Sequence, residues 1–308
     1  MSGISVVIPC RNEDLLGWTV ANIRASQLPG EVAEIIVIDD GGAPGTVPPY
    51  VHEQATVLTC QQRGNCPSRD AGIEMASHDL CLVLDAHMTM PPAGWITKAL
   101  QWHRPEVIAC TTINGIPHPE RGDMGRPESA KSQYFGAKLT PWHQGRHGDY
   151  RCWQGHWETE QGHKDSLNAG LIAPVGCIMG GAYFLSKRHY LETLNRPWAE
   201  LRGWGTSEPV ISITHRRLGY ALECWPMWFG HVFRASAPYV VQMAYLWHNQ
   251  LVAAALAGQG NMAAKLAQAN PNHEQVIAAG QRLFNERAKA WCDGMEAHWV
   301  CQLVEAGQ

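Results

Sequence analysis

The stretch EIIVIDDGG, residues 34–42, is a continuous run of mostly β-branched apolar residues that is closed by two aspartates and two glycines. Three further apolar runs have the same character, at residues 5–9, 56–58 and 80–84. Residues with helical spacing lie between these runs, for example Leu16, Val20 and Ile23. Buried strands that alternate with helices are typical of a mostly parallel sheet with helices on both faces. The sequence therefore predicts an α/β fold.

Length and composition allow one large domain of this kind, alone or with a modest appendage. The 308 residues are 45% hydrophobic and 17% charged, which is typical of a folded protein. A formal net charge of -4 gives no general attraction to nucleic acid or to an anionic membrane. The 10 cysteines are scattered and form no CxxC pair, which predicts reduced, buried thiols. With no apolar leader and no spanning segment, we expect a cytoplasmic protein.

Polar side chains stand where the predicted strands end. Asn12 follows the first strand, Asp39 and Asp40 close the second, and Asp85 follows the fourth. In sheets of this class, ligands bind beyond the carboxyl ends of the strands. These four residues therefore mark the expected ligand site.

Asp85 and His87 have the spacing at which two residues of a strand face the same side. One carboxylate and one neutral imidazole suit a divalent transition ion such as Mn²⁺, with diphosphate oxygens and water as further ligands. His231, in GHVFR, is a candidate third ligand. Taken singly, a strand-end aspartate or a lone histidine is more often structural than ligating. The metal site is therefore a hypothesis that depends on further motifs.

Several motifs, in their order along the chain, resemble glycosyltransferase family 2 and its relatives with a GT-A fold. In the first half these are SVVIPCRNE (5–13), EIIVIDDGG and the strand that ends in the acidic motif. The second half resembles the catalytic domain of polypeptide N-acetylgalactosaminyltransferases, through the motifs LDAHMTMPPAGWI (84–96), MGGAYFLSKRHY (179–190), GWGTSEPVISITHRRLGYALE (203–223) and GHVFRASAPY (230–239). The resemblance covers about residues 4–240. It implies a GT-A fold, Mn²⁺ or another divalent cation, and transfer of a sugar from a nucleotide diphosphate sugar, with UDP as the favoured nucleotide.

The resemblance also implies roles for single residues. It implies the metal ligands Asp85, His87 and His231, and the donor-binding residues Pro9, Asn12, Asp39, Asp40, Arg69, Gly180, Gly181, Trp204 and Tyr239. Arg69 would lie near the donor phosphates or ribose, and the two glycines would let the backbone approach the transferred sugar. Arg234 and Tyr239 would belong to a loop that closes over the diphosphate and excludes water. There Arg234 would stabilise the departing diphosphate by a charge-assisted hydrogen bond, as a catalytic residue.

The chain departs from the family in one motif. The family has WGGEN where this chain has WGTSE, residues 204–208, so that Ser207 stands at the family's glutamate and Glu208 at its asparagine. Many inverting members of family 2 have the acidic catalytic base at this second position, and Glu208 would then deprotonate the acceptor hydroxyl. In a retaining enzyme Glu208 would instead bind the donor sugar. The structural alternative is a glutamate at a helix N-terminus. Glu208 is thus a second candidate catalytic residue, and the stereochemistry of transfer stays open.

The predicted organisation is a GT-A domain over residues 1–240 and a helical region over residues 241–308. Residues 1–112 would form the nucleotide-binding half of the domain and residues 175–240 the acceptor and metal half. Residues 113–174 are rich in Trp and His and have weak periodicity, which predicts an irregular segment on the acceptor side. The relatives have a membrane anchor and a lectin domain that this sequence does not resemble, so the resemblance does not imply a peptide acceptor.

Residues 142–164 hold most of the tryptophans and histidines of that segment. Aromatic rings of this kind stack on a sugar or an exposed base, and packing on the domain is an equal alternative. His143 and His147 have i, i+4 spacing, but without a nearby cysteine or a helical context we do not expect a second metal there.

These observations bear on four candidate functions. The first is a glycosyltransferase whose acceptor hydroxyl belongs to a glycan, a protein or a small molecule. A phage-type variant would glycosylate hydroxymethylated bases in DNA, using residues 142–164 and the basic residues Arg282, Arg287 and Lys289. A nucleotidyltransferase would have a glycine-rich phosphate loop, which the sequence CRNED (10–14) lacks. A non-catalytic nucleotide-sugar binder would not need the metal ligands together with Glu208.

Overall fold

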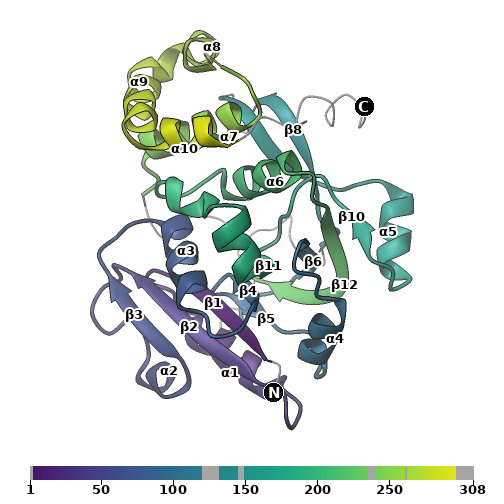
Figure 1. The fold of residues 1–308 in the computed structure, drawn as a ribbon. Coiled ribbons are helices and arrows are strands. Elements are labelled where there is room, and N and C mark those ends of the chain that lie inside the picture. The colour runs from purple at the N-terminus through teal and green to yellow at the C-terminus, as the bar shows by residue number, and fades with distance from the viewer. Residues whose placement is uncertain (1–2, 120–131, 145–148, 235–239, 261, 296–308) are drawn as a thin grey trace.

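The computed structural model describes residues 3–119, 132–144, 149–234, 240–260 and 262–295 (Figure 1). Its centre is one large mixed sheet with the strand order β10-β12-β6-β11-β4-β1-β2-β3. The bounds of these strands, in chain order, are β1 (Ile4–Cys10), β2 (Ala33–Asp40), β3 (Thr56–Cys60), β4 (Leu80–Leu84), β6 (Ile108–Gly115), β10 (Ala173–Pro174), β11 (Ala182–Ser186) and β12 (Leu222–His231). Two short strands join it at the side, β5 (Met88–Thr89) on β12 and β7 (Gln133–Tyr134) on β6.

Most strands in this order run in the same direction, as the sequence predicted. β1 pairs in parallel with β2 and β4, and β2 with β3. β11 runs antiparallel to both β4 and β6, and β6 is parallel to β12. β12 therefore runs in the same direction as β4, and the carboxyl ends of β1, β2, β4 and β12 lie at one edge of the sheet.

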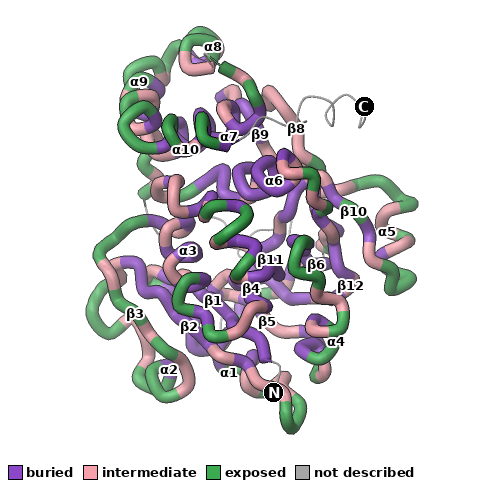
Figure 2. Tube along the Cα trace, in the orientation of Figure 1, coloured by how far each residue is buried: buried purple, intermediate pink, exposed green. Residues whose placement is uncertain are grey.

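Helices cover both faces of the sheet because successive strand residues point to opposite sides. Val6 and Ile8 belong to one hydrophobic cluster, with side chains of α1, α2 and α4, whereas Val7 belongs to another, with α3 and α6. These helices are α1 (Leu16–Ala25), α2 (Pro49–Gln54), α3 (Asn65–Met75), α4 (Trp95–Trp102) and α6 (Ser207–Arg217). Figure 2 shows the central strands almost entirely buried. Burial on both faces explains why the strand sequences are continuously apolar.

Residues 113–174 are not irregular where the structure describes them, which corrects the prediction. They include the antiparallel pair β8 (Ala137–Gln144) and β9 (Tyr150–Trp157), followed by α5 (Gln161–Asn168). Gln250 accepts hydrogen bonds from the backbone N–H groups of Cys152 (2.7 Å) and Trp153 (3.2 Å) in β9. Most residues of this pair are only partly buried. The two strands therefore lack the alternation of apolar and polar residues that predicts a strand from sequence.

The C-terminal region is helical, as predicted, over its described residues. It consists of α7 (Met243–Leu256), α8 (Met262–Ala269), α9 (Glu274–Leu283) and α10 (Lys289–Gly294), with short helical turns η4 (Pro271–His273) and η5 (Phe284–Ala288) between them. Trp247 and Val252 of α7 belong to the same hydrophobic cluster as Val210 of α6. The C-terminal helices therefore share a core with the sheet domain. Two further helical turns precede α6, η2 (His189–Thr193) and η3 (Pro197–Glu200).

Among the described residues, no helix has the length and apolar character needed to cross a bilayer.

Candidate functional site

A cavity of about 570 Å³ lies at the edge of the sheet where the strands β1, β2, β4 and β12 end. Its wall includes Pro9, Asp40, Asp85, His87, Trp204 and His231. All six are among the residues that the sequence predicted to bind the donor or the metal. The volume is within the usual range for pockets that bind small molecules and cofactors.

The three predicted metal ligands converge at this cavity. Asp85 follows β4 directly, and β5 pairs with the end of β12 so that His231 stands opposite Met88. The backbone N–H of Val232 also donates to the carbonyl of His87 (3.1 Å). One ligand atom from each of Asp85, His87 and His231 lies within 4.8 Å of the others. The short β5–β12 pairing therefore brings together residues that are far apart in the sequence.

This donor set fits a divalent transition ion. The imidazole rings of His87 and His231 have centroids 4.8 Å apart and are tilted by 32°, and Nε2 of His231 lies 3.6 Å from Oδ2 of Asp85. Burial alone would raise the pKa of Asp85, but the hydrogen bond from His231 and the charge of Arg69 hold it well below its ordinary value. Two imidazoles and one anionic carboxylate suit Mn²⁺ or Zn²⁺ and leave positions for other ligands.

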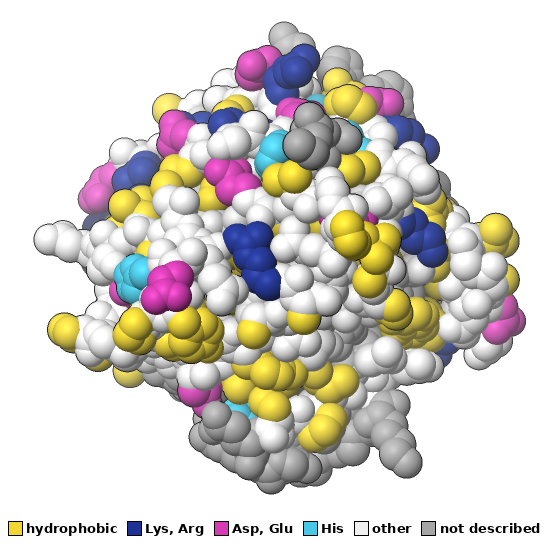
Figure 3. All heavy atoms as spheres, turned by 90° about the horizontal axis from the view of Figure 1, so that it is seen from below, with side chains coloured by type: hydrophobic (Ala, Val, Ile, Leu, Met, Phe, Trp, Pro, Cys, Tyr) yellow, Lys and Arg dark blue, Asp and Glu magenta, His cyan; other side chains and the backbone are white. Residues whose placement is uncertain are grey.

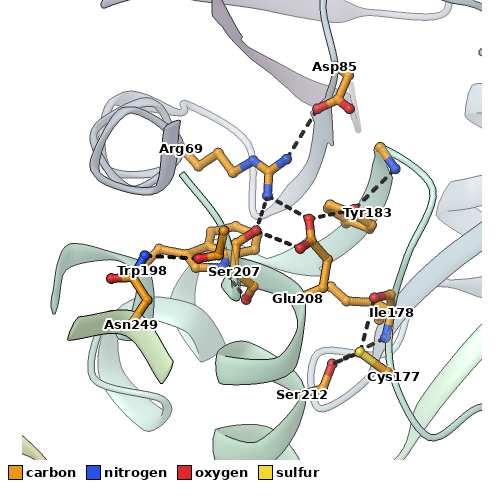
Figure 4. Close-up of polar contacts among 12 residues, drawn as sticks. Arg69, Asp85, Cys177, Ile178, Tyr183, Trp198, Ser207, Glu208, Ser212 and Asn249 are labelled. Carbon is orange, nitrogen blue, oxygen red and sulfur yellow. Dashed lines mark hydrogen bonds and ion pairs between the residues drawn. The ribbon is translucent and has the colours of Figure 1, made fainter. Parts of the chain in front are cut away.

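Arg69 of α3 lies behind the metal ligands and does not line the cavity. Its guanidinium bridges two carboxylates, with Nη2 at 3.1 Å from Asp85 and Nη1 at 3.2 Å from Glu208 (Figure 4). The residue is 2% exposed. Burial would lower the pKa of Arg69, but Glu208 and Asp85 raise it, so the group stays charged. The prediction placed Arg69 at the donor phosphates or ribose; in this structure it contacts the site through Asp85.

Glu208 stands at the first turn of α6, and its carboxylate accepts hydrogen bonds from three sides (Figure 4). Arg69 donates to Oε1, the hydroxyl of Tyr183 donates to Oε1 at 3.0 Å, and Ser207 donates to Oε2 at 2.7 Å. Burial and the neighbouring Glu208 raise the pKa of Tyr183 well above its ordinary value, so its hydroxyl keeps the proton that it donates. Glu208 is thus fixed in one position just behind the cavity wall. A role as base stays a prediction.

Gly181 lies directly against the candidate metal ligand Asp85, and Gly180 precedes it. A Cβ on Gly181 would lie 2.6 Å from Oδ2 of Asp85, and one on Gly180 would lie 2.7 Å from Ile113. Both have positive φ, +84° and +119°. The amide N–H of Asp85 donates to the carbonyl of Gly181 (2.8 Å). Close approach and a backbone conformation that side chains disfavour therefore both require glycine here; approach to a donor sugar stays a prediction.

The predicted nucleobase residues differ in what they contact. Asp40 lines the cavity and accepts hydrogen bonds from the backbone N–H groups of Arg63 (2.7 Å) and Gly64 (2.9 Å). Asp39 accepts from the N–H of Gly42, and Asn12 accepts from the N–H of Ala43. Asp39 and Asn12 therefore shape the loop after β2, whereas Pro9 and Asp40 reach the cavity.

Arg234 lines the cavity beside His231, but Tyr239 lies outside the described residues. Nη2 of Arg234 lies 2.6 Å from Oε2 of Glu13 and 3.2 Å from Oδ1 of Asp14. The same oxygen of Glu13 lies 3.1 Å from Nδ1 of His87. Neither Glu13 nor Tyr183 was among the predicted site residues. Glu13 carried a weak signal, because it follows a predicted strand end that already held Asn12.

The residues of the 142–164 segment stand apart from the cavity, whose wall contains none of the described ones. Trp142 stacks on Tyr150 with ring centroids 5.7 Å apart, and His143 packs on His156 at 4.0 Å. These contacts favour the packing alternative. His147, the proposed partner of His143, lies outside the described residues.

The mixed sheet with helices on both faces is a GT-A-type fold, and comparison with known proteins gives the family of the chain. The family model for glycosyl transferase family 2 matches residues 5–170, more than half of the chain. The chain belongs to glycosyltransferase family 2. No curated protein sequence matches it.

Two solved structures have a similar fold. One is GalNAc-T7 with UDP, GalNAc and Mn²⁺, with a TM-score of 0.63 at 18% identity; the match covers 88% of this chain and 55% of that one. The other is S. aureus TarS 1–349 with UDP-GlcNAc, with a TM-score of 0.52 at 10% identity over 91% of this chain and 72% of that one. The chain thus spans little more than half of the GalNAc-T7 chain. At these identities the likeness establishes the GT-A-type fold.

Proposed function

We propose that this chain transfers a sugar from a nucleoside diphosphate donor to an acceptor hydroxyl, with a divalent cation held by Asp85, His87 and His231. The observation that carries the proposal is the meeting of these three side chains at the wall of a cavity beyond the strand ends. Neither imidazole brings a negative charge, so Asp85 alone contributes one. A cation with such ligands keeps most of its charge for the diphosphate.

The leaving group explains why this arrangement is useful. When the glycosidic bond to the donor breaks, negative charge builds on the diphosphate oxygens, and Mn²⁺ would neutralise it as a Lewis acid. Arg234 lines the same cavity and would donate a charge-assisted hydrogen bond to the diphosphate. We therefore assign Arg234 to stabilisation of the departing diphosphate. Trp204, 43% exposed at the cavity wall, would shield the donor from water.

We assign the nucleotide to the part of the cavity formed by Pro9 and Asp40, with Asn12 and Asp39 shaping the adjacent loop. Uridine is the favoured base, and Mn²⁺ the favoured cation, by analogy. The support is that both solved structures with a similar fold hold a uridine nucleotide, one of them with Mn²⁺.

The transferred sugar would lie near Gly180, Gly181 and Glu208. Glu208 is held in place by Arg69 and Tyr183, which suits a carboxylate that must keep a fixed orientation toward a sugar or an acceptor hydroxyl. We assign Glu208 to this side of the reaction, either as the base of an inverting transfer or as a ligand of the donor sugar. The anomeric configuration of the product distinguishes the two roles.

No specific observation favours a DNA acceptor. Lys289, one of the basic residues that the alternative needs, pairs with Asp293, and Arg151 pairs with Asp149 at 2.8 Å. The face shown in Figure 3 mixes basic, acidic and hydrophobic side chains. Binding to DNA depends on basic groups gathered on one face. The acceptor class is therefore a matter for direct assay.

The proposal is tested by the release of UDP from a panel of UDP-sugars, with Mn²⁺ or with a chelator. We expect release that requires Mn²⁺ and that Asp85→Ala abolishes. Asp165→Ala is the matched control, because Asp165 is exposed on α5 away from the cavity. Release of UDP that is equal in the chelator, or that Asp85→Ala leaves intact, would contradict the proposal.

A further inference from the structure

Glu13 joins two candidate site residues that come from distant parts of the chain. Its Oε2 lies 3.1 Å from Nδ1 of His87 and 2.6 Å from Nη2 of Arg234. The side chain is only 8% exposed, although the residue lines the cavity. A nearly buried carboxylate that contacts both groups fixes their positions relative to each other.

The contact with Glu13 determines which ring nitrogen of His87 is available to a metal ion. A carboxylate only accepts hydrogen bonds, so it keeps the proton of a neutral imidazole on Nδ1 and leaves the lone pair on Nε2. Metal-binding histidines commonly donate their second ring N–H to a carboxylate, which fixes the tautomer and the orientation of the ring. Glu13 stands in that relation to His87, on the opposite side of the ring from Nε2.

The contact with Arg234 adds a second function to the same oxygen. Asp14 approaches the same guanidinium nitrogen at 3.2 Å, but it is half exposed, so Glu13 provides the more buried of the two anchors. A long arginine side chain otherwise samples many rotamers. Held by Glu13, the guanidinium of Arg234 stays beside the candidate metal ligands at the cavity wall.

We propose that Glu13 is a positioning residue of the transferase site, which orients His87 toward the metal ion and holds Arg234 next to the metal site. This role rests on the proposed function, because it assumes that His87 is a metal ligand. The proposal adds a requirement beyond the three metal ligands. The carboxylate of Glu13, just after β1, must be present so that His87, just after β4, and Arg234, just after β12, act on the same donor.

The test measures Mn²⁺ binding in the presence of UDP, from the electron paramagnetic resonance signal of free Mn²⁺, for four forms of the protein. We expect Glu13→Ala to weaken Mn²⁺ binding by about 10–100-fold, the usual effect of losing the partner of a metal-binding histidine. Glu13→Gln should weaken it by a smaller factor, because its amide oxygen still accepts from Nδ1. Asp14→Asn is the control: it removes the neighbouring charge on Arg234 and leaves the Glu13–His87 contact in place, so Mn²⁺ affinity should not change.

The outcomes separate this role from the proposed function. If the parent protein with UDP binds no Mn²⁺, the proposed function fails. If the parent binds Mn²⁺ and both Glu13 variants bind it equally well, only the role of Glu13 is overturned. Should Glu13→Ala fail to fold, as judged by its circular dichroism, Glu13→Gln alone decides, because it conserves the size of the side chain.

Discussion

Nη2 of Arg69 lies 3.1 Å from Oδ1 of Asp85, so a buried cation shares the carboxylate that we assign to the metal. The other oxygen of Asp85 is the one that approaches His231. Because Arg69 also contacts Glu208, one guanidinium fixes the candidate metal ligand and the candidate catalytic carboxylate relative to each other. Arg69 compensates part of the charge of both acids, which explains how Asp85 at the cavity wall and Glu208 behind it are both largely buried.

We expect Arg69→Ala to destabilise the fold by about 3–5 kcal/mol, because removal of one partner leaves buried carboxylates uncompensated. The stability of Arg69→Lys should lie between that of the parent and that of Arg69→Ala, since an ammonium keeps the charge but does not present a fork to two carboxylates. Urea denaturation measures both. The control is Arg188→Ala, at an exposed arginine, which should change stability by no more than about 0.5 kcal/mol. Equal stability of the two alanine variants would show that Arg69 is not a structural bridge.

Tyr183 gives a prediction with a matched partner in the same protein. Its hydroxyl accepts from the N–H of Gly181 (3.1 Å) and donates to Glu208 (3.0 Å). The hydroxyl of Tyr190 likewise accepts from the N–H of Trp198 (3.3 Å) and donates to Asp70 (3.0 Å), away from the cavity. Both tyrosines are nearly or fully buried.

We therefore expect Tyr183→Phe and Tyr190→Phe to lose similar stability, about 1–3 kcal/mol in thermal or urea unfolding. Only Tyr183→Phe should also lower kcat for sugar transfer, because only it loosens Glu208 and the turn at Gly181. An unchanged kcat in Tyr183→Phe, or an equal fall in both variants, would argue that the position of Glu208 does not matter for the reaction.

The sheet was predictable because its central strands are buried on both faces. Residues 35–38 are all apolar up to the two aspartates, and in the structure β2 is buried almost throughout. β8 and β9 were not predictable, because they form a separate two-stranded pair in which most residues are partly exposed. Without a buried face, their sequence has no clear period of two.

The candidate site divides in the same way. Strand-end positions and motif order predicted that Asp85, His87 and His231 meet, and their ligand atoms do lie together. The contacts of Arg69 were not predictable, because nothing in PSRDAG distinguishes an arginine that faces a cavity from one that is buried against two acids. Glu13 and Tyr183 were missed for the same reason: their roles depend on tertiary packing between β1, β4, β11 and α6.

Stability should fall as the pH is lowered from about 6.5 toward 3, partly because of His215. This residue is 0% exposed, and burial lowers its pKa from 6.5 to about 3. In this window the unfolded chain binds a proton that the folded protein excludes, so acid favours unfolding; above the window the contribution is fully present. The size is on the order of a few kcal/mol for one group. Urea denaturation as a function of pH measures it.

The variant that tests this assignment is His215→Phe, because His215 packs against the rings of His189 and Tyr220 and phenylalanine keeps an aromatic ring there. Its stability should depend less steeply on pH than that of the parent. Some dependence should remain, since burial also lowers the pKa values of His189 and His248. A slope identical to that of the parent would exclude His215 as a source of acid sensitivity.

Gly181 offers the sharpest test of the metal site, because the chain contains a second glycine of nearly identical φ with which to compare it. Gly181 and Gly170 have φ of +84° and +83°. A Cβ on Gly181 would meet Oδ2 of Asp85 at 2.6 Å, whereas a Cβ on Gly170 would have nothing within 4 Å. Alanine at either position therefore causes similar backbone strain, about 1–2 kcal/mol, but only at Gly181 does it displace the carboxylate.

We expect Gly181→Ala to lose Mn²⁺ binding in the presence of UDP, as well as sugar transfer, while Gly170→Ala keeps both at a similar cost in stability. The physical reason is that metal ligands tolerate displacements of only a few tenths of an ångström, and the Asp85 carboxylate has Arg69 behind it and His231 beside it, so it has no room to retreat without breaking one of those contacts. If Gly181→Ala bound Mn²⁺ as tightly as Gly170→Ala, the oxygen of Asp85 that faces Gly181 would not be a metal ligand, and the cation would have to be held without it.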